Sequence, residues 1–262
     1  RRGLASALQP RVETALQILR FSAEADRIEL SVHVALKAIR SIMSSTCLLE
    51  LLEGVLVLGN YVNAACKPLS AAVSVSLDSL AKLAHTKCLP NVQGHTSRSS
   101  RHNALELLVQ HLQQSRPSFR ESLLFDLEDC HASRDVDPKD LARDLEKLAA
   151  QTKSVEERIQ SGANHTVEGY GEPESMRLES LQSFILDAKP RVAAVRFLLQ
   201  EFEDETRNMR QWFAEAPTKT FVELMKNFEA LRAALPPARR TGKPPRTTRL
   251  PSGVLVSPSN QS

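Results

Sequence analysis

A short polar segment near the middle of the chain has the side chains of a contact site rather than of a catalytic one. It follows the most apolar run of the sequence, residues 48–58, and it consists of Gly59, Asn60, Tyr61 and, after one valine, Asn63. Glycine lets a second backbone approach closely, asparagine offers amide donors and acceptors, and tyrosine anchors interfaces. A plainer alternative is that a helix simply ends here, because glycine and asparagine are common where helices stop.

Elsewhere in the chain, the residue types that perform catalysis do not occur at the spacings of known catalytic or metal-binding motifs. Seven histidines are scattered, four cysteines form no CxxC pair, and neighbouring acids such as Glu128 and Asp129 point to different sides of a helix. Phosphate-binding, zinc-protease and nucleophile-elbow motifs are absent from the sequence. We therefore predict that the protein is not an enzyme and uses no cofactor, metal or small-molecule substrate, and the cysteine usage favours a reducing, intracellular setting.

The apolar run itself predicts a helix. Its stripe at helical spacing consists of Leu48, Leu51, Leu52, Val55, Leu58 and Val62. Further leucines and valines widen the stripe until most of the circumference is apolar, which predicts a helix inside a bundle. Residues 44–46 offer N-cap side chains, and the run is too short for a membrane span, which needs about 20 apolar residues.

The composition favours an all-α fold. Aromatic residues make up 5% of the 262 residues, and glycines number nine, whereas leucine, alanine and glutamate are abundant. Two heptad-spaced segments, 138–159 and 188–213, predict an antiparallel helical hairpin in an elongated multi-helix bundle. Pro190 should kink or restart the second of these helices near Lys189.

Shorter periodic segments complete the expected bundle. They lie at residues 4–19 with a break near Pro10, and at 23–43, 77–83, 105–112, 119–127 and 221–231. Residues 236–262 are rich in proline, arginine and serine, and we expect a disordered tail there. The predicted organisation is therefore a helical domain over 1–235 and a basic tail over 236–262.

The apolar run and the polar segment after it resemble the signature of the formin homology 2 domain, an apolar helix that leads into Gly-Asn-(Tyr/Phe)-x-Asn. Residues 77–83 followed by Thr86 and Lys87 resemble the family's "kLssLlkL.dTK" segment, and residues 137–159 resemble the helix after it. Phe213-Ala214-Glu215, followed by Phe221 and Phe228, is similar to the family's "fFgE … fF … F" ending. The resemblance covers roughly residues 11–235, in the family's order.

This resemblance implies an actin-binding module that forms head-to-tail dimers around the barbed end of the filament, nucleates filaments and stays attached as subunits add. In the family the Gly-Asn motif lies in the post, which the lasso of a partner subunit wraps. Gly59, Asn60, Tyr61 and Asn63 are therefore expected at a homodimer contact. Lys87 matches a family lysine that faces actin, and Lys82 precedes it in the same segment; the plainer alternative is a solvated lysine.

Other expectations also come from the resemblance. The family's lasso, linker and first part of the knob would lie upstream of Arg1, as expected for a fragment, and profilin–actin would be met through segments outside this chain. Ser74-Val75 stands where the family has Gly-Phe. A cytoplasmic location at the cytoskeleton is implied.

A second reading needs no actin contact at all. A helical scaffold would act through its basic tail on microtubules, an anionic membrane or nucleic acid. The tail lacks aromatic residues to stack on bases, which weakens the nucleic-acid reading, and a solubilising linker is a third possibility. The tail holds no acid and five cations: Arg239, Arg240, Lys243, Arg246 and Arg249.

Overall fold

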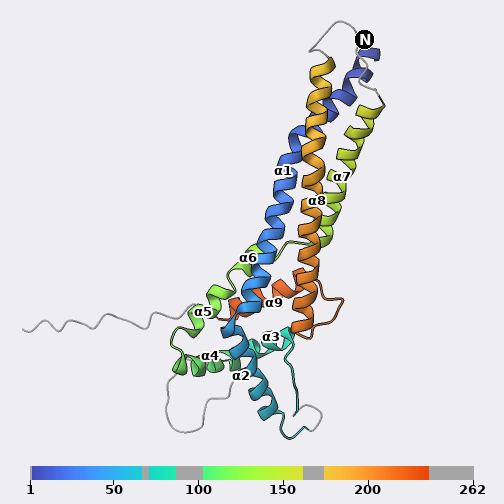
Figure 1. Cartoon of the computed structure of the whole chain (residues 1–262). Helices are drawn as coiled ribbons and strands as arrows, with labels where there is room; N and C mark the ends of the chain where they lie inside the picture. Colours follow the sequence, from blue (N-terminus) through green and yellow to red (C-terminus); the bar gives the residue numbers. More distant parts are fainter. Residues whose placement is uncertain (1, 67–70, 87–102, 162–173, 236–262) are drawn as a thin grey trace, which may run out of the picture.

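The computed structural model describes residues 2–66, 71–86, 103–161 and 174–235. Within these ranges the chain forms nine α-helices and no strand, so the predicted all-α class is confirmed. The helices build an elongated molecule with a three-helix rod at one end and a group of shorter helices at the other (Figure 1). The predicted tail lies outside the described residues.

The rod consists of α1 (Arg2–Ser44), α7 (Pro138–Gln160) and α8 (Glu174–Trp212). Helix α7 runs antiparallel to α8, because Glu146 pairs with Arg196 while Glu156, farther along α7, pairs with the earlier Lys189. The predicted hairpin is therefore confirmed. The buried seams of the three helices include Ile28, Val32, Leu145, Leu148, Val192 and Val195.

Two expected breaks in α1 and an expected restart of α8 at Pro190 were wrong. Helix α1 is continuous from residue 2 to 44, through Pro10 and through the expected gap between residues 19 and 23. Helix α8 likewise passes through Pro190 and begins at Glu174, well before the predicted start. A proline removes one backbone hydrogen bond, and in the rod this local loss is offset by apolar burial that continues on either side, at Ile185, Ala188 and Val192.

The shorter helices pack around the lower end of α1 and α8 (Figure 1). Their bounds are α2 (Thr46–Val62), α3 (Leu77–His85), α4 (Ala104–Ser115), α5 (Phe119–Asp126), α6 (Asp129–Ser133) and α9 (Phe221–Ala234). All match predicted segments except α6, which has only five residues and so carries no periodic signal. Four buried phenylalanines, Phe119, Phe202, Phe221 and Phe228, join these helices into one core with the rod.

Side-chain caps explain where several helices begin. The Ser45 hydroxyl accepts from the Leu48 amide at 3.0 Å, as the serine-rich segment predicted. Asp137 caps α7, with Pro138 at the first helical position. Thr220 and Glu223 form a reciprocal capping box at α9.

No single helix in the described ranges is long and apolar enough to cross a membrane, and only α1 and α2 taken together, bent by 55°, meet that length and composition.

Candidate functional site

Helix α2 divides into a buried first half and an exposed second half. Cys47, Leu48, Leu51 and Val55 are buried against the neighbouring helices. Gly54 lies so close to α4 that a Cβ added there would come within 2.9 Å of the Leu108 side chain. The first half of α2 is therefore a tightly packed core helix, as its apolar pattern predicted.

The second half departs from that prediction. The exposed fractions are 70% for Val57, 80% for Tyr61 and 70% for Val62. Val73, in the segment that faces this end of the helix, is 91% exposed. An all-round apolar helix was expected inside a bundle, but α2 projects past the helices that cover its first half (Figure 1). We call residues 57–66 and 71–76 the α2 tip.

Gly59 and Asn63 form the last turn of α2, so the plainer reading of this segment as a helix end is confirmed. The Asn63 amide donates to the carbonyl oxygens of Gly59 and Tyr61. A Cβ added at Gly59 would meet no described atom within 4 Å. The glycine is thus not required by a close approach within the described part of the chain, and its surface is available to another backbone.

Asn60 has a structural task inside the chain. Its side-chain oxygen accepts from the Ala72 amide at 3.0 Å, and its side-chain nitrogen donates to the Ala72 carbonyl at 3.0 Å. This paired contact holds the segment after α2 against the helix. No local pattern predicted this contact, because its partner is backbone twelve residues away. The Tyr61 side chain is 80% exposed and has no hydrogen bond within the described ranges, so its ring is accessible for contact.

The predicted actin-facing lysines lie at the end of α3. Lys82 is exposed in the last turn of α3, and its carbonyl accepts from the Thr86 hydroxyl at 2.9 Å. Lys87 lies outside the described residues, as do the five predicted tail cations. The structure therefore gives the position of Lys82 alone among these predicted residues.

A partly buried charge network fixes the start of α3 and hence the position of Lys82. Lys219 donates to Glu215 at 2.9 Å and to Asp78 at 3.0 Å. Glu215 also accepts from the Leu77 amide at 2.8 Å. Burial works against the charge on Lys219, but these two carboxylates outweigh it and raise its pKa; the hydrogen bond from Lys219 in turn lowers the pKa of Asp78. The network joins α3 to the loop between α8 and α9.

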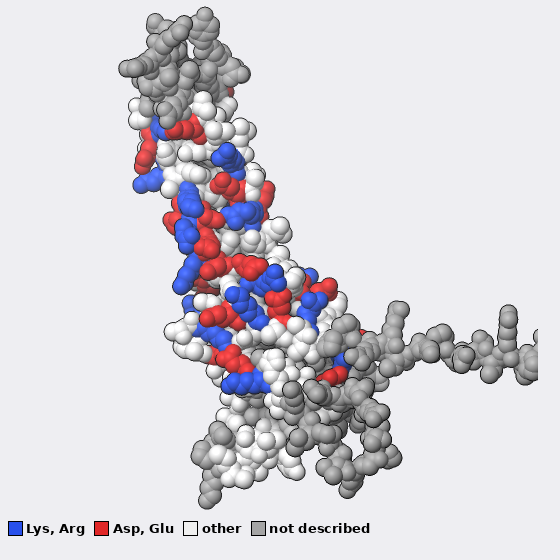
Figure 2. All heavy atoms as spheres, turned by 180° about the vertical axis from the view of Figure 1, so that it is seen from behind, with Lys and Arg blue, Asp and Glu red and all other residues white. Residues whose placement is uncertain are grey.

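Charge is distributed unevenly over the molecule. Residues 54–66 and 71–77 contain no charged side chain. Figure 2 shows lysine, arginine, aspartate and glutamate intermixed along the rod, whereas the lower end, where α2 lies, is uncharged on this face among the described residues. The α2 tip is thus apolar, aromatic and amide-bearing, which suits contact with another protein.

Comparison with known proteins identifies the family. The family model of the Formin Homology 2 Domain matches residues 5–235. Formin-like protein 3 of Oryza sativa subsp. japonica is 24% identical over 216 residues, which is 80% of this chain and 16% of that protein. Protein diaphanous homolog 3 of Homo sapiens is 23% identical over 219 residues, 82% of this chain and 17% of that protein. The chain spans about a sixth of the length of these curated relatives. The predicted resemblance is confirmed, and the chain belongs to the formin homology 2 domain family.

Proposed function

We propose that this chain is a formin-type module that binds actin at filament barbed ends and controls their assembly. The observation that carries the proposal is the combination of a family match over residues 5–235 with an α2 end that keeps its aromatic and apolar side chains exposed. A binding module needs such a surface, since a side chain already buried in its own core has nothing left to offer a partner.

The α2 tip is the proposed contact with a second copy of the chain. Tyr61 and Val57 lie one turn apart on α2 and offer an apolar anchor, and Gly59 leaves room for a partner backbone. Asn60 contributes by holding Ala72 in place rather than by meeting the partner directly. Asn63 lies at the helix end, with its side chain partly exposed.

Actin is the proposed partner of the α3 end. Lys82 is exposed there and has no ion pair within the described ranges, and Lys87 follows five residues later in the sequence. Two cations this close in sequence suit the acidic surface of an actin filament. The family's cytoskeletal setting in the cytoplasm, and a supply of profilin–actin through segments outside this chain, belong to the same proposal.

The decisive measurement is elongation of preformed actin seeds in the presence of the whole chain. We expect altered barbed-end elongation, reduced by Lys87→Glu and by Lys82→Glu with unchanged helicity. A variant in which all five tail cations become glutamine separates the body from the tail. If that variant alone loses the effect, the tail and not the helical body binds filaments, and the proposal fails.

Self-association is tested by sedimentation velocity at micromolar concentration. We expect Tyr61→Ser to weaken association while the melting temperature stays unchanged, because the ring is exposed in the isolated chain. The matched control is Phe197→Ser, which removes a ring that is 72% exposed on the rod. Equal association of wild type and both variants would contradict a dimer contact at the α2 tip.

A further inference from the structure

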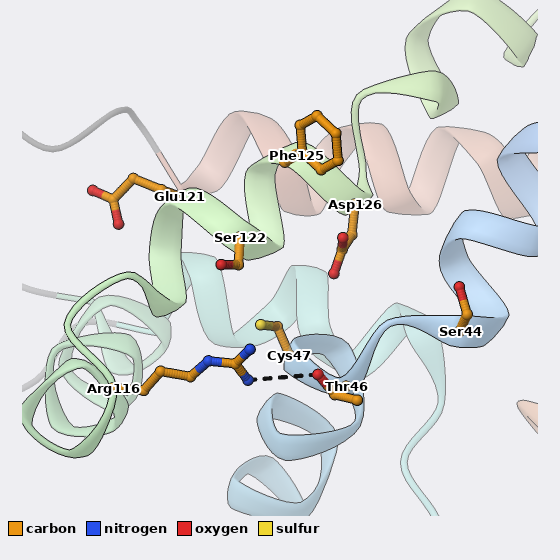
Figure 3. Close-up of a pocket in the computed structure, with 8 residues that line it drawn as sticks. All are labelled: Ser44, Thr46, Cys47, Arg116, Glu121, Ser122, Phe125 and Asp126. Carbon is orange, nitrogen blue, oxygen red and sulfur yellow. Dashed lines mark hydrogen bonds between the residues drawn. The ribbon is translucent and has the colours of Figure 1, made fainter.

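Two adjoining hollows lie around the start of α2, at the opposite end of this helix from the α2 tip. One of about 470 Å³ separates the α1–α2 junction from α5, and the other, about 310 Å³, lies between the last turns of α1 and the start of α6. Ser44 and Phe125 line both hollows, so the two form one groove, which we call the Phe125 groove. The Phe125 ring lies over α5 in Figure 3 and is 73% exposed.

The cations around the Phe125 groove are all engaged within the chain. Each is held by a carboxylate at 2.7–3.1 Å. The pairs are Lys37 with Asp129, Arg40 with Glu201, and Arg116 with Glu50. None of these positive charges is therefore left to attract an anion, and the groove is a poor phosphate or carboxylate site.

The acids around the groove are in excess. Glu121 and Glu128 lie on either side of Phe125 in sequence, are exposed, and have no ion pair in the described part of the chain. Asp126 accepts the Ser45 hydroxyl at 2.6 Å but meets no cation among the described residues. An exposed aromatic ring between unpaired carboxylates selects a ligand that is both apolar and positively charged.

The chain itself contains a segment of this chemistry. In the tail, Pro244 and Pro245 are flanked by Lys243 and Arg246. Paired prolines favour the extended polyproline II conformation, which docks on aromatic grooves with little loss of entropy. We propose that the Lys243-Pro244-Pro245-Arg246 segment of the tail binds in the Phe125 groove of its own chain, with the prolines on the ring and the two cations toward Glu121 and Glu128.

The end of the described chain lies within reach of this groove. Helix α9 ends at Ala234, and Leu235 is buried in the shared core. Near its end α9 packs against α6, where Glu229 accepts from Arg134 at 2.9 Å, and the first residue of α6, Asp129, lines the groove. Lys243 follows Leu235 by eight residues, which span about 25 Å in polyproline II conformation, about twice the length of the eight-residue α5. The tail therefore reaches the groove without unfolding α9. The proposal is independent of actin binding.

Zero-length carbodiimide cross-linking tests the proposal on the full chain. Lys243 is the single lysine of the tail, so each tail cross-link reports its position. We expect amide bonds from Lys243 to Glu121 or Glu128 within one chain, found by peptide mass spectrometry, and a yield that falls about tenfold between 0.05 and 0.5 M salt because screening weakens exposed ion pairs. The internal reference is the exposed Glu179, about 33 Å along α8 from Glu201.

Variants that keep every cross-linking group separate docking from chance encounter. Phe125→Ser and the double change Pro244→Gly, Pro245→Gly are expected to lower the yield several-fold, whereas the control Phe197→Ser leaves it unchanged. Phe125 is exposed, so its variant is expected to keep the wild-type melting temperature. A yield to Glu121 and Glu128 no greater than that to Glu179, or one unaffected by Phe125→Ser, overturns the proposal. So do cross-links that join heavy-isotope and ordinary chains in a mixture, since those assign the groove to a second copy's tail.

Discussion

The rod and the α2 tip stabilise their surfaces in opposite ways. Ion pairs between helices cover the outside of the rod, including Arg27–Asp144, Arg40–Glu201, Arg191–Asp26 and Arg196–Glu146. The α2 tip has no charged residue and leaves Tyr61 and Val73 exposed. The rod pairs many of its charged side chains with one another, whereas the tip leaves apolar groups exposed among the described residues. The contrast separates a supporting region from the proposed binding region.

One ion pair of the lower end, Lys219 with Glu215, is more buried than the ion pairs of the rod. The side chains of Lys219 and Glu215 are 13% and 7% exposed, against 55% and 68% for Arg196 and Glu146. Removing one member of a buried pair leaves the other charge uncompensated, while an exposed pair contributes little. Neutralising one member of each pair should therefore lower the free energy of unfolding by very different amounts at the two ends.

The largest expected effect comes from Glu215→Gln. It leaves Lys219 without its buried partner and weakens the acceptor for the Leu77 amide, so we expect the free energy of unfolding to fall by about 3 kcal/mol. Urea unfolding followed by circular dichroism measures it. The matched control, Glu146→Gln on the rod, should cost less than about 1 kcal/mol. Similar losses for both variants would remove the distinction between the ends.

Ser45→Ala is expected to have the next largest effect. The hydroxyl caps α2 and donates to Asp126 at 2.6 Å, so its loss should lower the free energy of unfolding by about 1–2 kcal/mol. Ser45→Asn, which restores a capping side chain, should recover part of that loss. The same urea unfolding experiment decides; a loss below about 0.3 kcal/mol would show that the cap contributes nothing measurable.

Ala214→Gly is expected to stabilise the protein. Ala214 has a φ of 50° where the chain leaves α8, a left-handed conformation that is unfavourable for a residue with a Cβ. Glycine removes this strain at the junction of rod and lower end, and we expect a gain of about 1 kcal/mol in the free energy of unfolding. Ala216→Gly, without a positive φ, is the control and should give no gain. An unchanged or lower stability for Ala214→Gly would contradict the expected strain.

The smallest effects on stability should occur at the α2 tip. Asn60→Ala removes both hydrogen bonds to Ala72 and should cost about 1 kcal/mol or less, because the site is exposed to water. Hydrogen exchange of the Ala72 amide should accelerate clearly. Tyr61→Ala should leave both quantities unchanged. If Tyr61→Ala destabilised the chain as much as Asn60→Ala, the ring would have a role in the fold and the tip would not be a free surface.

Local patterns predicted what depends on local physics. The cap and proline at Asp137–Pro138, the start of α2 after Ser45, and the heptad seams of α7 and α8 all follow from spacing and capping chemistry. The continuity of α1 and α8 could not be predicted from local patterns, because apolar burial along a three-helix rod outweighs the cost of a single proline. The exposure of the α2 tip could not be predicted either, since an apolar helix has the same sequence pattern whether it packs in its own core or against a partner.

The groups that the sequence did not reveal depend on distant parts of the chain. The contact between Asn60 and Ala72 and the network around Lys219 each join side chains to backbone or charges that come together only when the helices pack. The Phe125 groove likewise arises from the relative positions of α1, α2 and α5. The helical spacing of apolar residues carries no information about such contacts between distant parts of the chain.

The single residue between α1 and α2 has a geometric consequence. Ser45 is the one non-helical residue between two helices that together cover residues 2–62, and the helices meet at 55°. Helix α2 is about 25 Å long, so this angle displaces its far end by about 20 Å from the line of the rod. A helical conformation at residue 45 would join the two helices into one straight helix. The direction in which this molecule presents the α2 tip, its proposed binding surface, is thus set by one serine and the aspartate that accepts its hydrogen bond.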